Sequence, residues 1–108
     1  MPETFSATAA VPTQSGSRYL QQLCKHWQHN LAVTFTPEHG TVVFPKNARG
    51  ADFANDGLAT FDARSDALDV RIDASSPAQR DGLKDVVARH LDRFAFREAP
   101  LTFDWQDA

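Results

Sequence analysis

The sequence predicts an α+β fold: a two-layer sandwich in which two amphipathic helices lie on one face of a mostly antiparallel sheet. Three observations support this prediction. Two segments carry apolar residues at helical spacing, short segments alternate apolar with polar residues as half-buried strands do, and strands follow one another in pairs joined by turns. The predicted order of elements is β-α-β-β-β-β-α-β.

Length and charge fit one small globular domain. The 108 residues are 42% hydrophobic and 23% charged, so we expect a single domain over residues 1–108, with residues 1–4 disordered. The net charge is −3 and the four histidines are scattered, which leaves no basic stripe for a phosphate backbone. We therefore expect no nucleic-acid partner.

Three features favour a cytoplasmic location. Cys24 is the single cysteine and cannot form an internal disulfide, which suits a reducing compartment. The opening residues MPETFSATAA lack the basic and apolar regions of a signal peptide. No apolar run approaches the ~20 residues that a membrane span needs, so we expect no membrane partner.

The first strand and the first helix are separated by turn-forming residues. Weak alternation over residues 5–11 predicts the strand. The segment 18–29 predicts the helix, because its apolar residues recur at helical spacing and a serine, Ser15 or Ser17, is available as N-cap. The apolar residues of that helix are Leu20, Leu23, Cys24 and Trp27.

Two hairpins follow. Residues 31–36 alternate and pair with residues 41–44 across a Pro-Glu-His-Gly turn. Residues 45–57 are rich in glycine, proline and asparagine, so we expect a long, mobile connection with at most a short strand near Phe53. The second hairpin joins residues 59–63 to residues 68–72, with Phe61 opposite Val70 and Asp62 opposite Asp69.

The stretch 75–98 predicts the second helix. Ser76 is suited to the N-cap, Pro77 to the first turn, and Gln79 completes a Ser-x-x-Gln capping box. After Pro100, alternation over residues 101–105 predicts the last strand.

A histidine interrupts the apolar stripe of the second helix. The face is formed by residues at helical spacing, and His90 falls within ~30° of its middle. Its other members are Leu83, Val86, Val87, Leu91 and Phe94. A buried imidazole needs a hydrogen-bond partner. That partner is structural, such as a backbone carbonyl, Tyr19 or a carboxylate, or the ring lines a pocket and contacts a ligand. Both interpretations stay open.

Other reactive residues give weaker signals. His26, His39 and His90 are weak candidate metal ligands, whereas His29 is expected to point at water. Cys24 lies in an apolar stripe, which favours an inert thiol. The chain has no Cys-x-x-Cys or His-Glu-x-x-His motif, Gly-rich phosphate loop or nucleophile elbow. The sequence therefore leans against an enzyme without deciding the question, and we expect no cofactor.

Several segments together resemble one family. They are RYLQQLCKHW, the turn residues His39 and Gly40, VVARHLDRFAFRE and Trp105, and they are similar to the small bacterial proteins of domain-of-unknown-function family 2218. The resemblance covers Ser6 to Trp105 and departs from the usual pattern at residues 45–56. The family has no established activity, so the resemblance implies no catalytic residues. Similar domains occur attached to, or encoded near, siderophore-interacting flavoproteins, which implies a link to iron metabolism.

Three functional hypotheses follow. The leading one is a non-enzymatic accessory or binding module of siderophore and iron metabolism, which predicts a small-molecule pocket near His90. A domain that docks on a siderophore-interacting flavoprotein predicts an exposed apolar patch instead. A metal- or haem-binding protein predicts that His26 converges with a second histidine. The candidate ligand-binding residues are Tyr19, His26, Trp27, His90 and Arg97.

Overall fold

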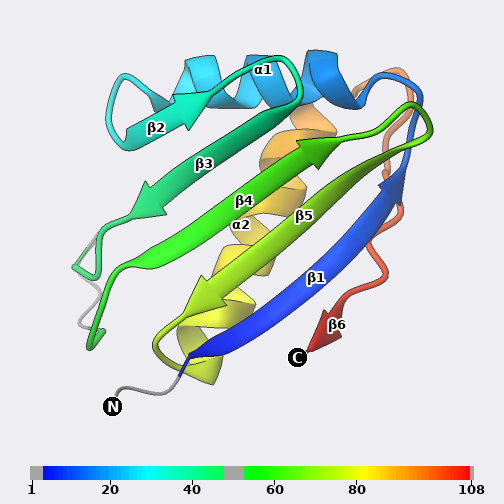
Figure 1. Ribbon diagram of the computed structural model, residues 1–108. Helices are drawn as coiled ribbons and strands as arrows, with labels where there is room; N and C mark the ends of the chain where they lie inside the picture. Colours follow the sequence, from blue (N-terminus) through cyan, green and yellow to red (C-terminus); the bar gives the residue numbers. More distant parts are fainter. Residues whose placement is uncertain (1–3, 48–52, 108) are drawn as a thin grey trace.

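The computed structural model describes residues 4–47 and 53–107. These residues form a two-layer α+β sandwich in which both helices cover the same face of one sheet (Figure 1). The predicted fold class and element order are therefore confirmed. The elements are β1 (Phe5–Pro12), α1 (Gly16–Trp27), β2 (Ala32–Phe35), β3 (His39–Phe44), β4 (Gly57–Ala63), β5 (Ala67–Ala74), α2 (Pro77–Phe94) and β6 (Gln106–Asp107).

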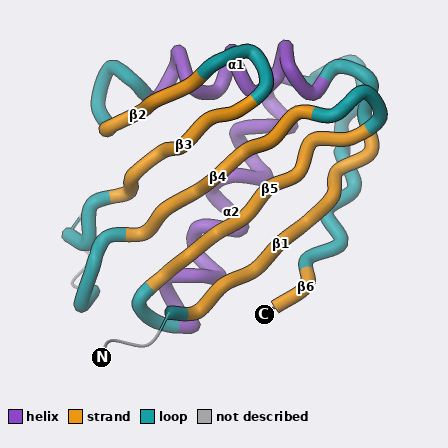
Figure 2. Tube along the Cα trace, viewed as in Figure 1, coloured by secondary structure: helices purple, strands orange, loops and turns teal. Residues whose placement is uncertain are grey.

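The sheet is antiparallel throughout and its strands run in the order β2-β3-β4-β5-β1-β6. Four of these strands follow in chain order, and β1 is then added beside β5 (Figure 2). Apolar residues on the covered face, such as Val42, Phe61 and Ile72, are fully buried beneath the helices. The sheet therefore provides the floor of the core and the helices provide its cover.

The weakly predicted first strand is confirmed as an internal strand. β1 lies between β5 and β6, where Ala7, Ala9 and Val11 face the core. Ser6 is buried as well, and its hydroxyl donates a hydrogen bond to Oδ1 of Asp73 at 2.6 Å. Small side chains explain why the alternation of this strand was faint in the sequence.

The predicted register of the second hairpin is confirmed. Phe61 lies opposite Val70 and Asp62 opposite Asp69. Each carboxylate has a partner of its own. Arg64 pairs with Asp69 at 2.8 Å, and His39 contacts Asp62 at 2.6 Å. Cross-strand repulsion is thereby offset on the exposed face of the sheet.

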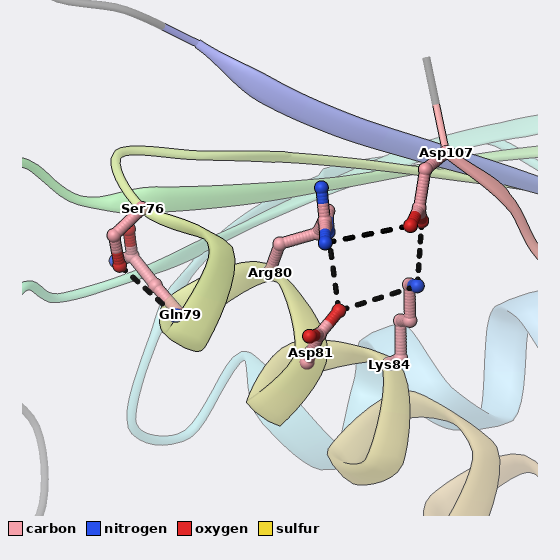
Figure 3. Close-up of polar contacts among 6 residues, drawn as sticks. All are labelled: Ser76, Gln79, Arg80, Asp81, Lys84 and Asp107. Carbon is pink, nitrogen blue, oxygen red and sulfur yellow. Dashed lines mark hydrogen bonds and ion pairs between the residues drawn. The ribbon is translucent and has the colours of Figure 1, made fainter.

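α2 begins as predicted but its capping box is shifted. The Ser76 hydroxyl accepts a hydrogen bond from the backbone N–H of Gln79 at 3.1 Å (Figure 3). The Gln79 side chain does not return to Ser76; its Oε1 accepts from the backbone N–H of Ser75 at 2.6 Å. Its Nε2 donates to the carbonyl of Asn55 at 2.9 Å. Gln79 therefore fixes the end of the β3–β4 connection against the start of α2.

The last strand is shorter and later than predicted. Pairing with β1 is confined to Gln106 and Asp107, and residues 101–105 run alongside without joining the ladder. Their alternation reflects packing instead: Leu101 is buried, and the rings of Phe103 and Trp105 stack with centroids 5.8 Å apart. Asp107 in β6 then joins an ion network with Arg80, Asp81 and Lys84 of α2, as Figure 3 shows.

The long connection between β3 and β4 is described only at its ends. Residues 48–52, on which much of the predicted mobile loop falls, lie outside the described residues, as do residues 1–3 of the predicted disordered terminus. At most a short strand was expected near Phe53, and the described residues 53–56 form none before β4 begins at Gly57. The Phe53 N–H donates to the Lys46 carbonyl at 3.0 Å, which closes the described ends of the connection.

In the described part of the chain, none of the helices is both long and apolar enough to cross a membrane.

Candidate ligand-binding site

A cavity of about 460 Å³ opens where the end of α1, the face of α2 and the end of β3 meet. His26, Trp27 and His90, three of the five residues predicted to form a site, line it. Trp27 is buried and His90 half-buried, whereas His26 is exposed and forms part of the rim. The remaining lining residues among those described are Asn30, Leu31, Phe44, Pro45, Phe53, Gln79, Gly82, Leu83 and Val86.

The spacing of residues along α2 explains which side chains face the cavity. Leu83, Val87 and Leu91 are one turn apart and buried in the core. A second row, displaced by one residue, consists of Gly82, Val86 and His90, all of which line the cavity. His90 is half-buried on this second row, next to the buried core row. The stripe is wider than a simple core face because its flank lines the cavity.

Aromatic and imidazole rings cluster around His90. The centroid of its ring lies 5.0 Å from that of Trp27 and 5.7 Å from that of His26. Trp27 in turn meets Phe44 edge to face, with centroids 5.0 Å apart. Edge-to-face contact is a favoured geometry for aromatic pairs, so these rings form a packed wall joining α1, β3 and α2.

The hydrogen bond of His90 fixes its tautomer. Its Nδ1 lies 2.7 Å from the carbonyl oxygen of Val86. A carbonyl can only accept, so Nδ1 carries the proton. In the neutral ring Nε2 is then an acceptor, and none of the described residues donates a hydrogen bond to it. The structural partner expected for His90 is thus a backbone carbonyl, and one ring nitrogen stays available.

His26 is held toward its neutral form. Desolvation of the ring is the main cause that lowers its pKa, and the nearby positive charges of His90, Arg93 and His29 lower it further. The ring also meets Phe94 edge to face, with centroids 5.7 Å apart. Both effects favour the neutral form of His26 near neutral pH.

Tyr19 lies away from this cavity. Its hydroxyl donates to Oε2 of Glu98, a carboxylate that also accepts from the hydroxyl of Thr13. The bond to Glu98 is the main cause that raises the pKa of Tyr19. Tyr19 therefore ties the start of α1 to the turn after α2, and the predicted contact between Tyr19 and the imidazoles is not formed.

Arg97 is also separate from the cavity lining. It is exposed, and its guanidinium lies 5.7 Å from the ring centroid of Phe96, beyond the end of α2. The five-residue surface expected from the sequence thus divides into a central group, His26, Trp27 and His90, and two outlying residues.

The third candidate metal ligand does not join the imidazole pair. His39 begins β3, and its Nδ1 contacts Oδ1 of Asp62 at 2.6 Å. Across the described residues, no group of three or more histidine, cysteine, aspartate or glutamate side chains is arranged to hold a metal ion. The convergence of His26 and His90 therefore provides two imidazoles without a further protein ligand.

The sequence matches a known protein family over nearly its full length. The profile of the family described as "Uncharacterized protein conserved in bacteria (DUF2218)" matches residues 8–106. This chain belongs to the DUF2218 family. The resemblance expected from the helix segments is thereby confirmed, and the cavity described above belongs to a DUF2218 fold.

A solved structure agrees with this assignment. The chain is similar to the one described as "NMR structure of PA4090 from Pseudomonas aeruginosa", with a TM-score of 0.72 and 30% sequence identity. The match covers 94% of this chain and 95% of the other. Among curated proteins, none matches this sequence.

Several cavity residues were not predicted from the sequence. Phe44 and Phe53 looked like ordinary strand or loop residues, and Gln79 was read only as a capping residue. Gly82 carried the one local signal, because a glycine inside a strong helix is unfavourable relative to alanine. Burial of Cys24 was predicted, and it raises the pKa of the thiol to about 11, as expected of an inert cysteine.

Proposed function

We propose that this DUF2218 domain is a non-enzymatic binding module that holds a small molecule in the cavity beside His90. The observation that carries the proposal is the cavity itself, whose volume of about 460 Å³ is typical of small-molecule sites. Its wall is mainly apolar and aromatic, and a few polar groups converge on it, as in most ligand pockets. The available nitrogen of His90 is one such group.

The lining favours an uncharged ligand. No lysine, arginine, aspartate or glutamate is present among the described lining residues. Burying a charged group without a partner is costly, and the lowered pKa of His26 keeps positive charge off the rim near neutral pH. We therefore propose a ligand that is neutral where it enters the cavity.

The proposal includes a link to siderophore and iron metabolism, which comes from the family resemblance. The cavity narrows the class of siderophore. A ferric tris-catecholate complex carries several negative charges, whereas many ferric tris-hydroxamate complexes are neutral. The neutral lining supports the hydroxamate class, or an uncharged part of a larger molecule.

We favour binding over catalysis because, among the described residues, no nucleophile is paired with the available nitrogen of His90. Nδ1 of His90 is bonded to the Val86 carbonyl. Cys24 is buried with a raised pKa, which disfavours the nucleophilic thiolate. Neither arrangement resembles a nucleophile paired with a base.

Docking on a flavoprotein partner is the alternative proposal. It called for an exposed apolar patch, and among the described residues the exposed large hydrophobic side chain is Phe96, with 71% of its surface accessible. A single exposed phenylalanine is an ordinary surface feature. The cavity therefore supports ligand binding more strongly than docking.

The proposal is tested by recording amide NMR spectra during titration with two gallium-loaded siderophores. One is a neutral trihydroxamate complex, desferrichrome, and the other a trianionic catecholate complex, enterobactin; gallium replaces ferric iron without paramagnetic broadening. Saturable shifts at His26, Trp27 and His90 with the neutral complex are expected. The matched control is a His29→Ala variant, which alters an exposed histidine outside the described lining and should titrate like the wild type.

Two results would contradict the proposal. If neither gallium complex shifts the cavity amides, the siderophore link is wrong. If shifts cluster on Phe96 and Arg97 while the cavity amides stay unchanged, the cavity is not the binding site for these molecules.

A further inference from the structure

Gly82 is a helix-interior glycine that the packing of the protein does not require. A Cβ atom built at this position meets no atom of the described residues within 4 Å. Three other glycines differ in this respect. A Cβ at Gly57 would overlap Cδ1 of Leu83, one at Gly40 would lie 2.9 Å from Sγ of Cys24, and one at Gly16 would lie 3.3 Å from the Ala67 carbonyl oxygen. Close packing therefore explains those glycines and leaves Gly82 unexplained.

Glycine at this position also disfavours the fold. Gly82 is an interior residue of the 18-residue helix α2, where glycine is less favourable than alanine because it loses more backbone freedom on folding. An alanine would fit into the space available. Helix stability alone would therefore favour alanine over glycine at residue 82.

Gly82 is exposed, and its backbone forms part of the cavity lining. It lies on the same row of α2 as Val86 and His90. Trp27 and Phe44 line the same cavity from α1 and β3. The bare backbone at Gly82 therefore forms a flat section of a wall that is otherwise built from aromatic and aliphatic side chains.

We propose that Gly82 is a ligand-contact position, and that a planar, uncharged aromatic group of the ligand lies against the α2 backbone there. The inference rests on the proposed function and concerns its second form, an uncharged part of a larger molecule, because a tris-hydroxamate such as desferrichrome carries no aromatic ring. Planar groups pack closely on an exposed helix backbone, and aromatic rings gain further from offset or edge contacts with Trp27 and Phe44. A side chain at residue 82 would occupy the space that the ring needs.

The test compares two neutral alcohols that have the same number of non-hydrogen atoms. One is planar 2-naphthol and the other globular 1-adamantanol. Dissociation constants are measured by NMR titration for the wild type, Gly82→Ala and Gly82→Val. The matched control is Asp85→Ala, which also improves helix propensity but lies on the exposed face of α2, where the Asp85 side chain is 67% accessible.

The wild type is expected to bind 2-naphthol more tightly than 1-adamantanol. Gly82→Ala should weaken 2-naphthol binding about fourfold, as expected when one methyl group displaces ligand contacts. It should also raise the melting temperature by about 4 °C through helix propensity. Gly82→Val should weaken binding at least about tenfold. Asp85→Ala should leave binding unchanged.

Gly82→Ala decides the test even if the β-branched valine of Gly82→Val disturbs the helix. Unchanged 2-naphthol binding in Gly82→Ala overturns the role of Gly82 while leaving the proposed function in place. Equal affinity of the wild type for both alcohols overturns the planar class. If the wild type binds neither alcohol and neither gallium siderophore, the proposed function is overturned together with this inference. If it binds a gallium siderophore but not 2-naphthol, only this inference is overturned.

Discussion

Nδ1 of His90 donates a hydrogen bond to the carbonyl oxygen of Val86, one turn earlier in α2, over 2.7 Å. In a regular helix the same carbonyl already accepts the backbone N–H of residue 90. The imidazole therefore adds a second bond to a satisfied acceptor. This relationship separates the structural contribution of His90 from its proposed contact with a ligand.

Replacing His90 with leucine should change stability by less than about 1 kcal/mol, because no buried polar group loses its last partner. If Nε2 accepts a hydrogen bond from the ligand, His90→Leu should weaken 2-naphthol binding about tenfold. Urea denaturation measures the first effect and NMR titration the second. The ligand-side control is 2-methoxynaphthalene, which has no donor and should bind both proteins alike. Equal loss for both ligands would mean that His90 contributes shape and not a hydrogen bond.

Stability should fall in mildly acidic solution because of His26. The pKa of its ring is lowered from 6.5, chiefly by desolvation, so the unfolded chain takes up this proton at a higher pH than the folded protein does. The stability carried by the neutral ring is fully present above pH 6.5 and is lost as the pH falls through that value toward the folded pKa. Urea midpoints at about pH 7.5 and about pH 5 should differ more for the wild type than for His26→Gln. His29→Gln should retain the wild-type difference.

The ion network on α2 should stabilise the β6 segment in a salt-dependent way. Asp107 lies 2.6 Å from Nζ of Lys84 and 3.4 Å from the guanidinium of Arg80, and its bond is the main cause that raises the pKa of Lys84. Since the Asp107 side chain is 49% accessible, Asp107→Asn should cost only about 0.5 kcal/mol in dilute buffer. In about 1 M NaCl the cost should nearly vanish.

Thermal melts at the two salt concentrations measure this effect. Asp85→Asn is the control, because it breaks the more exposed i,i+4 pair with Arg89, whose side chains are 61% and 67% accessible, and should have a smaller effect. A loss for Asp107→Asn that is equal at both salt concentrations would point to lost strand pairing and not to charge.

A side chain at Gly40 should destabilise the protein. A Cβ there would lie 2.9 Å from Sγ of Cys24 and 3.2 Å from Cβ of Phe35. Overpacking of this kind costs about 1–3 kcal/mol, so Gly40→Ala should lower the urea midpoint. Adding Cys24→Ala removes the closer contact and should recover part of the loss. Strict additivity of the two substitutions would show that the Sγ contact is not the cause.

Local signals were sufficient to predict most of the fold. The N-cap at Ser76 and the pairing of Phe61 with Val70 depend on neighbours in sequence, so the pattern specifies them directly. The last strand was misplaced because alternation over residues 101–105 arises equally from ladder pairing and from packing at a sheet edge. In that segment Leu101 is buried and Phe103 stacks on Trp105, but the segment does not join the ladder.

The candidate site was predictable only in part. His26, Trp27 and His90 stood out by residue type and helical position. Phe44 and Phe53 reach the same cavity from opposite ends of the β3–β4 connection, and no local pattern reports that meeting. The sequence did not indicate that Tyr19 lies outside this cavity, because its partner, Glu98, is 79 residues away in the chain.

The position of β1 has a consequence for biosynthesis. β1 precedes the other elements of this sheet in the chain, yet both of its neighbours, β5 and β6, come late. The bonded residues Ser6 and Asp73 are 67 positions apart. Closing so long a loop costs conformational entropy before the strand contacts form, and this cost slows folding. During translation the β1 segment therefore waits, with its apolar face uncovered, until β5 has left the exit tunnel. A chain that stalls before β5 would expose this segment to chaperones and proteases.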